Sequence, residues 1–135
     1  MTSNTPQPLT FAVRGGCAVV LGCKADVTAL TIPDAWNGLP VTDIAPGAFR
    51  NHPCLLSVTL PDNLRTVGEE AFADCHALMH VTAGSGLERL GERAFFRCIS
   101  LTGLHFATVP DADITTFAGC CLLTQQGEIA SYRRV

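Results

Sequence analysis

The sequence has few charges, few aromatic side chains and no long hydrophobic run. Charged residues make up 16% of its 135 residues, aromatic residues 7%, and the net charge is −3. There is no basic block, and the Arg133-Arg134 pair is too small to indicate nucleic-acid binding. No apolar run approaches the roughly 18–20 residues of a membrane span. Because of these absences, we expect neither a nucleic-acid partner nor a membrane-spanning helix.

The N-terminus lacks the basic start and apolar core of a signal peptide. Residues 1–8 are polar and proline-bearing, and we expect a disordered tail there. As written, the chain is expected in the cytoplasm unless a leader was removed, so its localisation stays open. The seven cysteines are an odd number, which argues against a complete disulfide framework. The 47% hydrophobic content predicts one globular domain over residues 9–135.

A repeat organises most of the chain. Four phenylalanines recur every 22–23 residues, and each is followed six residues later by a leucine. The pairs are Phe49/Leu55, Phe72/Leu78, Phe95/Leu101 and Phe117/Leu123. Self-similarity at a period of about 20–29 residues marks a solenoid, in which each coil buries its apolar side against its neighbours.

Two patterns recur within each period. L-x-x-V-x-L predicts short strands within residues 55–60, 78–83 and 101–106, and residues 27–32 fit the same template as an earlier coil. V-x-x-I-x-x-x-A-F, as in residues 41–49, has a spacing that suits a tight turn leading into a short helix or 3₁₀ segment.

The two ends differ from the middle. Residues 9–26 contain two β-rich runs around Gly15-Gly16, which predicts a hairpin cap on the first coil. The repeats then occupy residues 27–123. Residues 124–135, with Ile129 and Tyr132, look like a degenerate closing cap, as terminal repeats often are.

The repeated residues resemble those of a known family. "LTIPDAWNGLPVTDIAPGAF", followed by "AFADC" and "AFFRC", is similar to the BspA-type leucine-rich repeat, and the resemblance covers residues 24–123. It implies a right-handed coil of short parallel strands. It also implies a bacterial cell-surface or secreted protein that acts in adhesion and protein binding, and not an enzyme. His52 at the first cysteine position and Ala83-Gly84 in place of the aliphatic-proline pair depart from the pattern.

The stretch "EEAFADCHALMHVT" at residues 69–82 is the main candidate for chemistry. Cys75 belongs to a column whose other members, three residues after each repeat phenylalanine, are His52, Cys98 and Cys120. Equivalent side chains of a solenoid project in parallel, which is poor geometry for a tetrahedral zinc ion or a disulfide. We therefore predict a buried cysteine ladder with a structural role.

A catalytic dyad is also disfavoured. Cys75 and His76 are sequence neighbours in a turn, and such side chains tend to point apart. We therefore predict no catalytic residue, no metal site and no cofactor. Among the remaining thiols, Cys17 and Cys23 flank a short strand of the hairpin, so that a bridge between them is geometrically possible, and these thiols are mostly expected to be reduced or buried.

The variable positions of the strands form the candidate binding face. They make three columns: Thr28/Leu56/Met79/Thr102, Ala29/Ser57/His80/Gly103 and Thr31/Thr59/Thr82/His105. The mixed apolar, threonine and histidine surface favours a protein partner. The candidate partner-binding residues are Leu56, Ser57, Thr59, Met79, His80, Thr82, Thr102 and His105. The sequence thus predicts a non-enzymatic interaction module, with a structural spacer or self-associating unit as the alternative.

Overall fold

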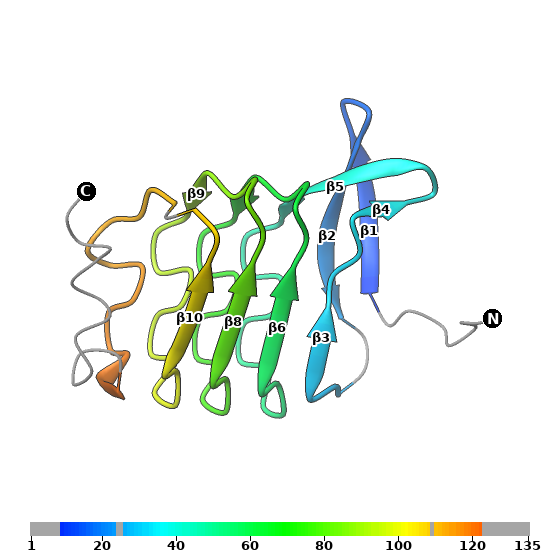
Figure 1. Cartoon of the computed structure of the whole chain (residues 1–135). Helices are drawn as coiled ribbons and strands as arrows, with labels where there is room; N and C mark the ends of the chain where they lie inside the picture. Colours follow the sequence, from blue (N-terminus) through cyan, green and yellow to red (C-terminus); the bar gives the residue numbers. More distant parts are fainter. Residues whose placement is uncertain (1–8, 24–25, 109, 123–135) are drawn as a thin grey trace.

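The structure, a computed structural model, describes residues 9–23, 26–108 and 110–122. The chain winds into a solenoid with a front sheet and a rear sheet on opposite sides (Figure 1). Successive coils lie side by side, and each contributes one short strand to the front sheet. The predicted repeat solenoid is therefore confirmed.

The front sheet has the spatial order β10, β8, β6, β3. Its strands are β3 (Ala29–Thr31), β6 (Ser57–Leu60), β8 (His80–Ala83) and β10 (Gly103–Phe106). All pairings are parallel and in register, so that Ser57 lies beside His80, and His80 beside Gly103. These strands confirm the prediction from L-x-x-V-x-L, although each begins two residues after the first position of the pattern.

The rear sheet extends beyond the predicted hairpin into strands that were not predicted. Its main path runs through β1 (Leu9–Arg14), β2 (Cys17–Cys23), β5 (Leu39–Ile44), β7 (Thr66–Val67) and β9 (Arg89–Leu90). From β2 to β9 all pairings are parallel. The strands come from the V-x-x-I part of the second pattern. β7 and β9 are each two residues long, which is too short for an alternation of apolar and polar residues to be detected in the sequence.

Two hairpins meet at the N-terminal end. β1 and β2 pair antiparallel, as predicted, with Gly15 and Gly16 at φ values of 60° and 80°, which glycine adopts at little cost. A second hairpin joins β4 (Ala35–Trp36) to the start of β5. Phe11 of β1 stacks on Trp36 of β4, with ring centroids 4.9 Å apart, so the two hairpins pack on each other.

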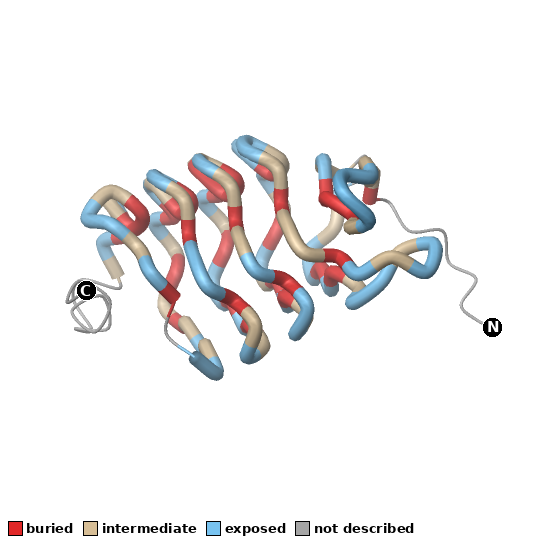
Figure 2. Tube along the Cα trace, turned by 90° about the horizontal axis from the view of Figure 1, so that it is seen from above, coloured by how far each residue is buried: buried red, intermediate tan, exposed pale blue. Residues whose placement is uncertain are grey.

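The core is a set of columns that run along the solenoid. Figure 2 shows buried and exposed stretches alternating along the coils. The repeat phenylalanines stack face to face at centroid distances of 5.1 Å for Phe49–Phe72, 5.2 Å for Phe72–Phe95 and 5.5 Å for Phe95–Phe117. All four are at most 2% exposed. Burying each such ring stabilises the fold by about 1.5–3 kcal/mol before entropy is counted, so the column explains why phenylalanine marks the repeat.

The segments around these phenylalanines are successions of turns, as the tight turn predicted, but neither the short helix nor the 3₁₀ segment expected to follow it is formed there. Alternate N–H groups donate to the next coil instead of within the segment: the Phe49 N–H reaches the Ala71 carbonyl at 2.7 Å. Residues two before or two after each phenylalanine have positive φ; they are Gly47, Asn51, Glu70, Asp74, Arg93, Arg97 and Gly119. An α-helix requires negative φ throughout, which these residues interrupt.

The predicted tail at 1–8 and closing cap at 124–135, with Ile129 and Tyr132, lie outside the described residues. The proposed limits of the domain therefore stay predictions. Across the described ranges, the chain forms no helix of the length and apolar character that a bilayer crossing requires.

Candidate interaction surface

The display face is the outward side of the front sheet and of the residues that lead into its strands. Strand alternation places Leu30, Val58 and Val81 inward, each at most 4% exposed, while the residues on either side of them turn outward. The strand register aligns the second and third predicted columns across the coils. Backbone hydrogen bonds connect the successive residues of the first column, which directly precede the strands. The predicted residues are thus brought together as neighbours on one surface; whether they bind a partner stays a prediction.

Leu56 and Met79 form the apolar part of this face. They precede β6 and β8, and 42% of Leu56 and 40% of Met79 is exposed. Their backbones extend the hydrogen bonding of the front sheet to the residues that precede its strands. The Met79 N–H donates to the Leu56 carbonyl at 2.7 Å, and the Thr102 N–H donates to the Met79 carbonyl at 2.9 Å. Two adjacent, half-exposed apolar side chains on rigid backbone are suited to contact with a protein.

The other two columns are polar. Thr31, Thr59, Thr82 and His105 are all exposed and form one outward row. In the second column Ser57 is half-buried and His80 is exposed, whereas Gly103 is buried although its position points outward. The rings of His80 and His105 lie with centroids 6.5 Å apart, and they cover Gly103.

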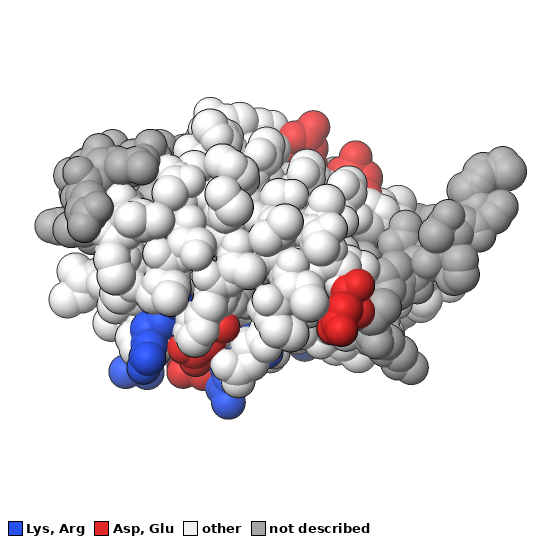
Figure 3. Space-filling view, turned by 90° about the horizontal axis from the view of Figure 1, so that it is seen from below, with Lys and Arg blue, Asp and Glu red and all other residues white. Residues whose placement is uncertain are grey.

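The display face carries no formal charge. Residues 27–32, 56–60, 79–83 and 102–106 contain no Asp, Glu, Lys or Arg. The underside of the solenoid, where the chain turns into the front strands, is also largely uncharged in Figure 3, with charged side chains at its margins.

The charged side chains form ion pairs on the turns. Glu70 bridges two coils, with Arg50 at 2.6 Å and Arg93 at 3.9 Å, and Asp74 lies 3.6 Å from Arg97. These residues are largely solvent-exposed, and such pairs contribute about 0–1 kcal/mol each. They are structural neighbours across the repeat.

The cysteine ladder is buried as predicted. Cys75, Cys98 and Cys120 are at most 1% exposed, and each thiol donates to the carbonyl of a phenylalanine on the preceding coil. Burial raises the pKa of the Cys75 thiol from 9.0 to about 11. The neighbouring Cys120 thiol and burial raise the pKa of Cys98. A protonated, inaccessible thiol is a poor nucleophile and a poor metal ligand.

His76 and Cys75 lie in different environments, because Cys75 is buried and His76 is not. His76 is exposed on the turn, with its Nε2 3.7 Å from a carboxylate oxygen of Asp74. The described residues contain no group of three or more histidine, cysteine or acidic side chains arranged to hold a metal. The stretch at 69–82 is therefore one coil of the scaffold, and its outward residues belong to the display face.

A Cys17–Cys23 bridge is excluded by the hairpin geometry. The two residues are the first and last of β2. At about 3.3 Å per strand residue they lie roughly 20 Å apart, whereas a disulfide needs Cα atoms within about 7 Å. The seven cysteines all lie among the described residues, and none of them forms a disulfide.

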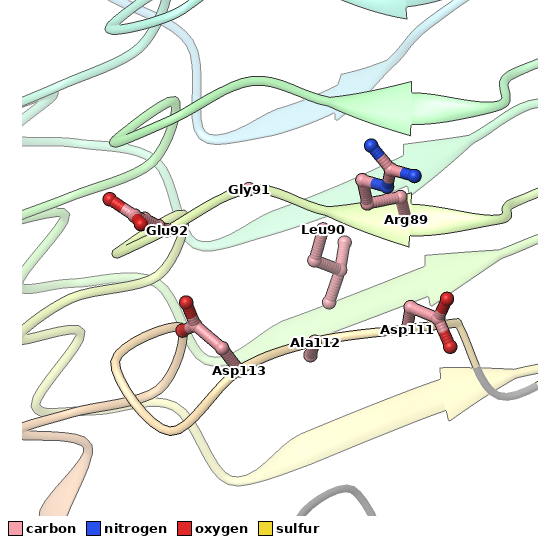
Figure 4. A pocket seen from close by; sticks show the side chains of 7 residues that line it. All are labelled: Arg89, Leu90, Gly91, Glu92, Asp111, Ala112 and Asp113. Carbon is pink, nitrogen blue, oxygen red and sulfur yellow. The ribbon is translucent and has the colours of Figure 1, made fainter. Parts of the chain in front are cut away.

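A hollow of about 470 Å³ lies beside β9 at the C-terminal end of the rear sheet (Figure 4). Its lining residues are Arg89, Leu90, Gly91, Glu92, Asp111, Ala112 and Asp113. The Asp113 carboxylate accepts hydrogen bonds from the Thr115 hydroxyl at 2.6 Å and the Thr115 N–H at 2.8 Å, and the hydroxyl lowers its pKa. Asp113 thus orders the turn that follows it.

Sequence reasoning missed the second hairpin and its aromatic pair. Its signal was present, because Asn37-Gly38 between Trp36 and Leu39 is the dipeptide that two-residue hairpins prefer. Both residues have the positive φ that this turn requires, 52° and 78°. The pairing of His80 with His105 was also missed, because it depends on strand register.

Comparisons with known proteins agree with this architecture. The BspA type leucine rich repeat region matches residues 26–127 in six copies. No curated protein matches the chain significantly. A leucine-rich repeat protein from Bacteroides capillosus ATCC 29799 is 32% identical, with a TM-score of 0.65, over 73% of this chain and 77% of that chain.

Two further solved structures share the fold. A leucine rich cell surface protein from Faecalibacterium prausnitzii A2-165 is 24% identical, with a TM-score of 0.70, over 86% of this chain and 40% of that chain. The T. pallidum leucine rich repeat protein is 19% identical, with a TM-score of 0.62, over 90% of this chain and 80% of that chain. The chain thus spans less than half the length of the Faecalibacterium protein.

Proteins built from this repeat are generally non-enzymatic repeat or interaction modules. The six matched copies extend over most of the sequence, and the 32% identical relative has the same solenoid. The chain belongs to the BspA-type leucine-rich-repeat family.

Proposed function

We propose that this chain is a non-enzymatic module that binds a protein partner through the display face. The observation that carries the proposal is the uncharged, in-register face of the front sheet, with Leu56 and Met79 as its exposed apolar anchors. A rigid parallel sheet holds these side chains in place before binding, which reduces the entropy lost on association. Adhesion to a host or matrix protein is the finer form of the proposal, and it follows from the family.

The proposal assigns the contacts to the eight predicted residues. Leu56 and Met79 would enter a complementary apolar pocket, and the hydroxyls of Thr59 and Thr82 would hydrogen-bond at its rim. Because the face lacks aromatic and arginine anchors, we expect modest affinity. The proposal gives no role in catalysis to any residue of the chain.

Charge substitution on the face tests the proposal. Wild-type protein, Met79→Glu and the control Val13→Glu are each immobilised, and captured proteins are identified by quantitative mass spectrometry. Val13 is 59% exposed but lies on β1, away from the display face. Wild-type protein and Val13→Glu are expected to capture the same specific partner, and Met79→Glu is expected not to capture it. The affinity of the purified partner should then be similar for wild-type protein and Val13→Glu and weaker for Met79→Glu. Equal capture by all three proteins would refute the face assignment.

Self-association is the second candidate, because the same exposed apolar pair could pack against a second copy. Sedimentation velocity over a concentration series distinguishes it. A dimer that Met79→Glu dissociates and Val13→Glu leaves intact would favour the structural role over partner binding.

A further inference from the structure

Two histidines from different coils meet on the display face. His80 begins β8 and His105 is the third residue of β10, so they are diagonal neighbours on adjacent parallel strands. Their rings lie at 6.5 Å between centroids and are inclined by 28°. Both side chains are exposed.

Gly103 brings these rings together. It lies directly beside His80 in the sheet and two residues before His105. A Cβ atom at Gly103 would stand 2.5 Å from Nδ1 of His80 and 3.1 Å from Nε2 of His105. One nitrogen of each ring therefore lies against Gly103, at a place where any other residue type would hold the two rings apart.

We propose that His80 and His105 together bind a late first-row divalent transition-metal ion, of which Ni²⁺ and Co²⁺ are suitable probes. Imidazole nitrogen is a preferred ligand for these ions. Because both side chains are exposed, their rings can turn between rotamers to approach metal–nitrogen bonding distance without disturbing the core. The surrounding face is uncharged, so no lysine or arginine of the display face repels the ion.

The site has two protein ligands. The described residues offer no third histidine, cysteine or acidic group in position, so water completes the coordination. The ion would bind without any protein partner, and the inference therefore goes beyond the proposed function and does not depend on it. The sequence predicted no metal here because the two histidines occupy different positions of the repeat, and only the strand register makes them neighbours.

Metal titration tests the proposal. Untagged protein carrying Cys121→Ser, which removes the exposed thiol, is titrated calorimetrically with NiCl₂ and then CoCl₂ in a non-coordinating buffer. One ion per chain is expected, with Ni²⁺ tighter than Co²⁺. Removing an outer-shell partner of a metal site costs about 10–100-fold in affinity, so loss of a direct ligand in His80→Ala or His105→Ala should weaken binding at least tenfold.

Two further variants make the result specific. His76→Ala removes an exposed histidine on a turn and should leave the affinity unchanged. Gly103→Ala keeps both ligands but places a methyl group against the His80 ring, and weaker binding is expected. Circular dichroism establishes that each variant is folded.

Paramagnetic broadening by bound Co²⁺ gives a positional readout. In ¹H–¹⁵N spectra the amides of Gly103 and Thr82 should broaden first. Undiminished affinity in the His80→Ala/His105→Ala double variant, or broadening centred on His76, would overturn the proposal.

Discussion

The thiol of Cys98 donates a hydrogen bond to the backbone carbonyl of Phe72 on the preceding coil, with sulfur and oxygen 3.1 Å apart. The same relationship recurs between Cys75 and Phe49 at 3.1 Å and between Cys120 and Phe95 at 3.0 Å. Each bond ties the turn of one coil to the turn of its neighbour. The cysteine of the repeat is therefore both a small apolar filler and an inter-coil donor.

Removal of one such thiol should destabilise the fold. Cys98→Ala loses the hydrogen bond and leaves a small void, so the free energy of unfolding should fall by about 1–2 kcal/mol. Urea denaturation measures this change. The matched control is Cys121→Ala at an exposed thiol, with an expected change within about 0.5 kcal/mol. Equal effects of the two substitutions would contradict a structural role for the ladder.

Alkaline pH should weaken the folded state through Cys75. Burial raises its pKa from 9.0 to about 11. Because the folded-state pKa lies above the unfolded one, the stabilisation is complete below about pH 9 and is lost as pH rises toward 11. The full shift corresponds to about 2–3 kcal/mol. Urea denaturation at pH 8, 9, 10 and 11 measures it, and Cys75→Ser, whose hydroxyl does not titrate in this range, should flatten the decline.

Thiol accessibility offers a separate check on the ladder. Iodoacetamide at pH 8 should modify Cys121 rapidly in the folded protein, while Cys75, Cys98 and Cys120 react only after unfolding. Mass spectrometry of peptides taken over time gives the rate at each site. Rapid folded-state modification of Cys98 would show that the ladder is accessible.

The phenylalanine stack should respond to truncation at its centre. Phe72 lies between Phe49 and Phe95 and is fully buried. Phe72→Ala is expected to cost about 3–5 kcal/mol. Phe72→Leu, which retains most of the volume, should cost about 1–2 kcal/mol. Thermal and urea unfolding measure both, and an Ala variant no less stable than the Leu variant would contradict the stacked core.

Gly119 combines a positive φ of 81° with close packing, since a Cβ there would meet Cγ of Arg97 at 2.9 Å. Gly119→Ala should destabilise the protein by about 1–2 kcal/mol from the left-handed conformation alone. Gly47 has a φ of 67° with open space around it, so Gly47→Ala isolates that conformational term. Urea denaturation of both variants should show a larger loss for Gly119→Ala, and a smaller loss there would exclude crowding by Arg97.

The repeat, the front strands and the N-terminal hairpin could be predicted because their signals recur or are strong locally. Four phenylalanines that recur every 22–23 residues and Gly15-Gly16 between β-rich runs carry that information. The rear strands could not be predicted, since Thr66–Val67 and Arg89–Leu90 are strands only by virtue of pairing with neighbouring coils. The helix prediction failed because the hydrogen bonds of the turns lead between coils.

The display face was predicted well in register and less well in detail. The three columns follow from the repeat, and the pairing of Ser57, His80 and Gly103 reproduces them. Alignment of equivalent positions cannot reveal contacts between different columns. The approach of His80 to His105 is such a contact, and it arises from the missing side chain at Gly103.

The constant register has a consequence for how the chain folds. Ser57 pairs with His80 and His80 with Gly103, so each pairing between these neighbouring front strands closes a loop of the same span, with the paired residues 23 positions apart in the sequence. The entropy lost on closing a loop depends on its length and not on how many coils are already formed. Each such coil therefore adds at the same entropic cost as the one before. Folding can nucleate at any pair of coils and then propagate coil by coil along the solenoid.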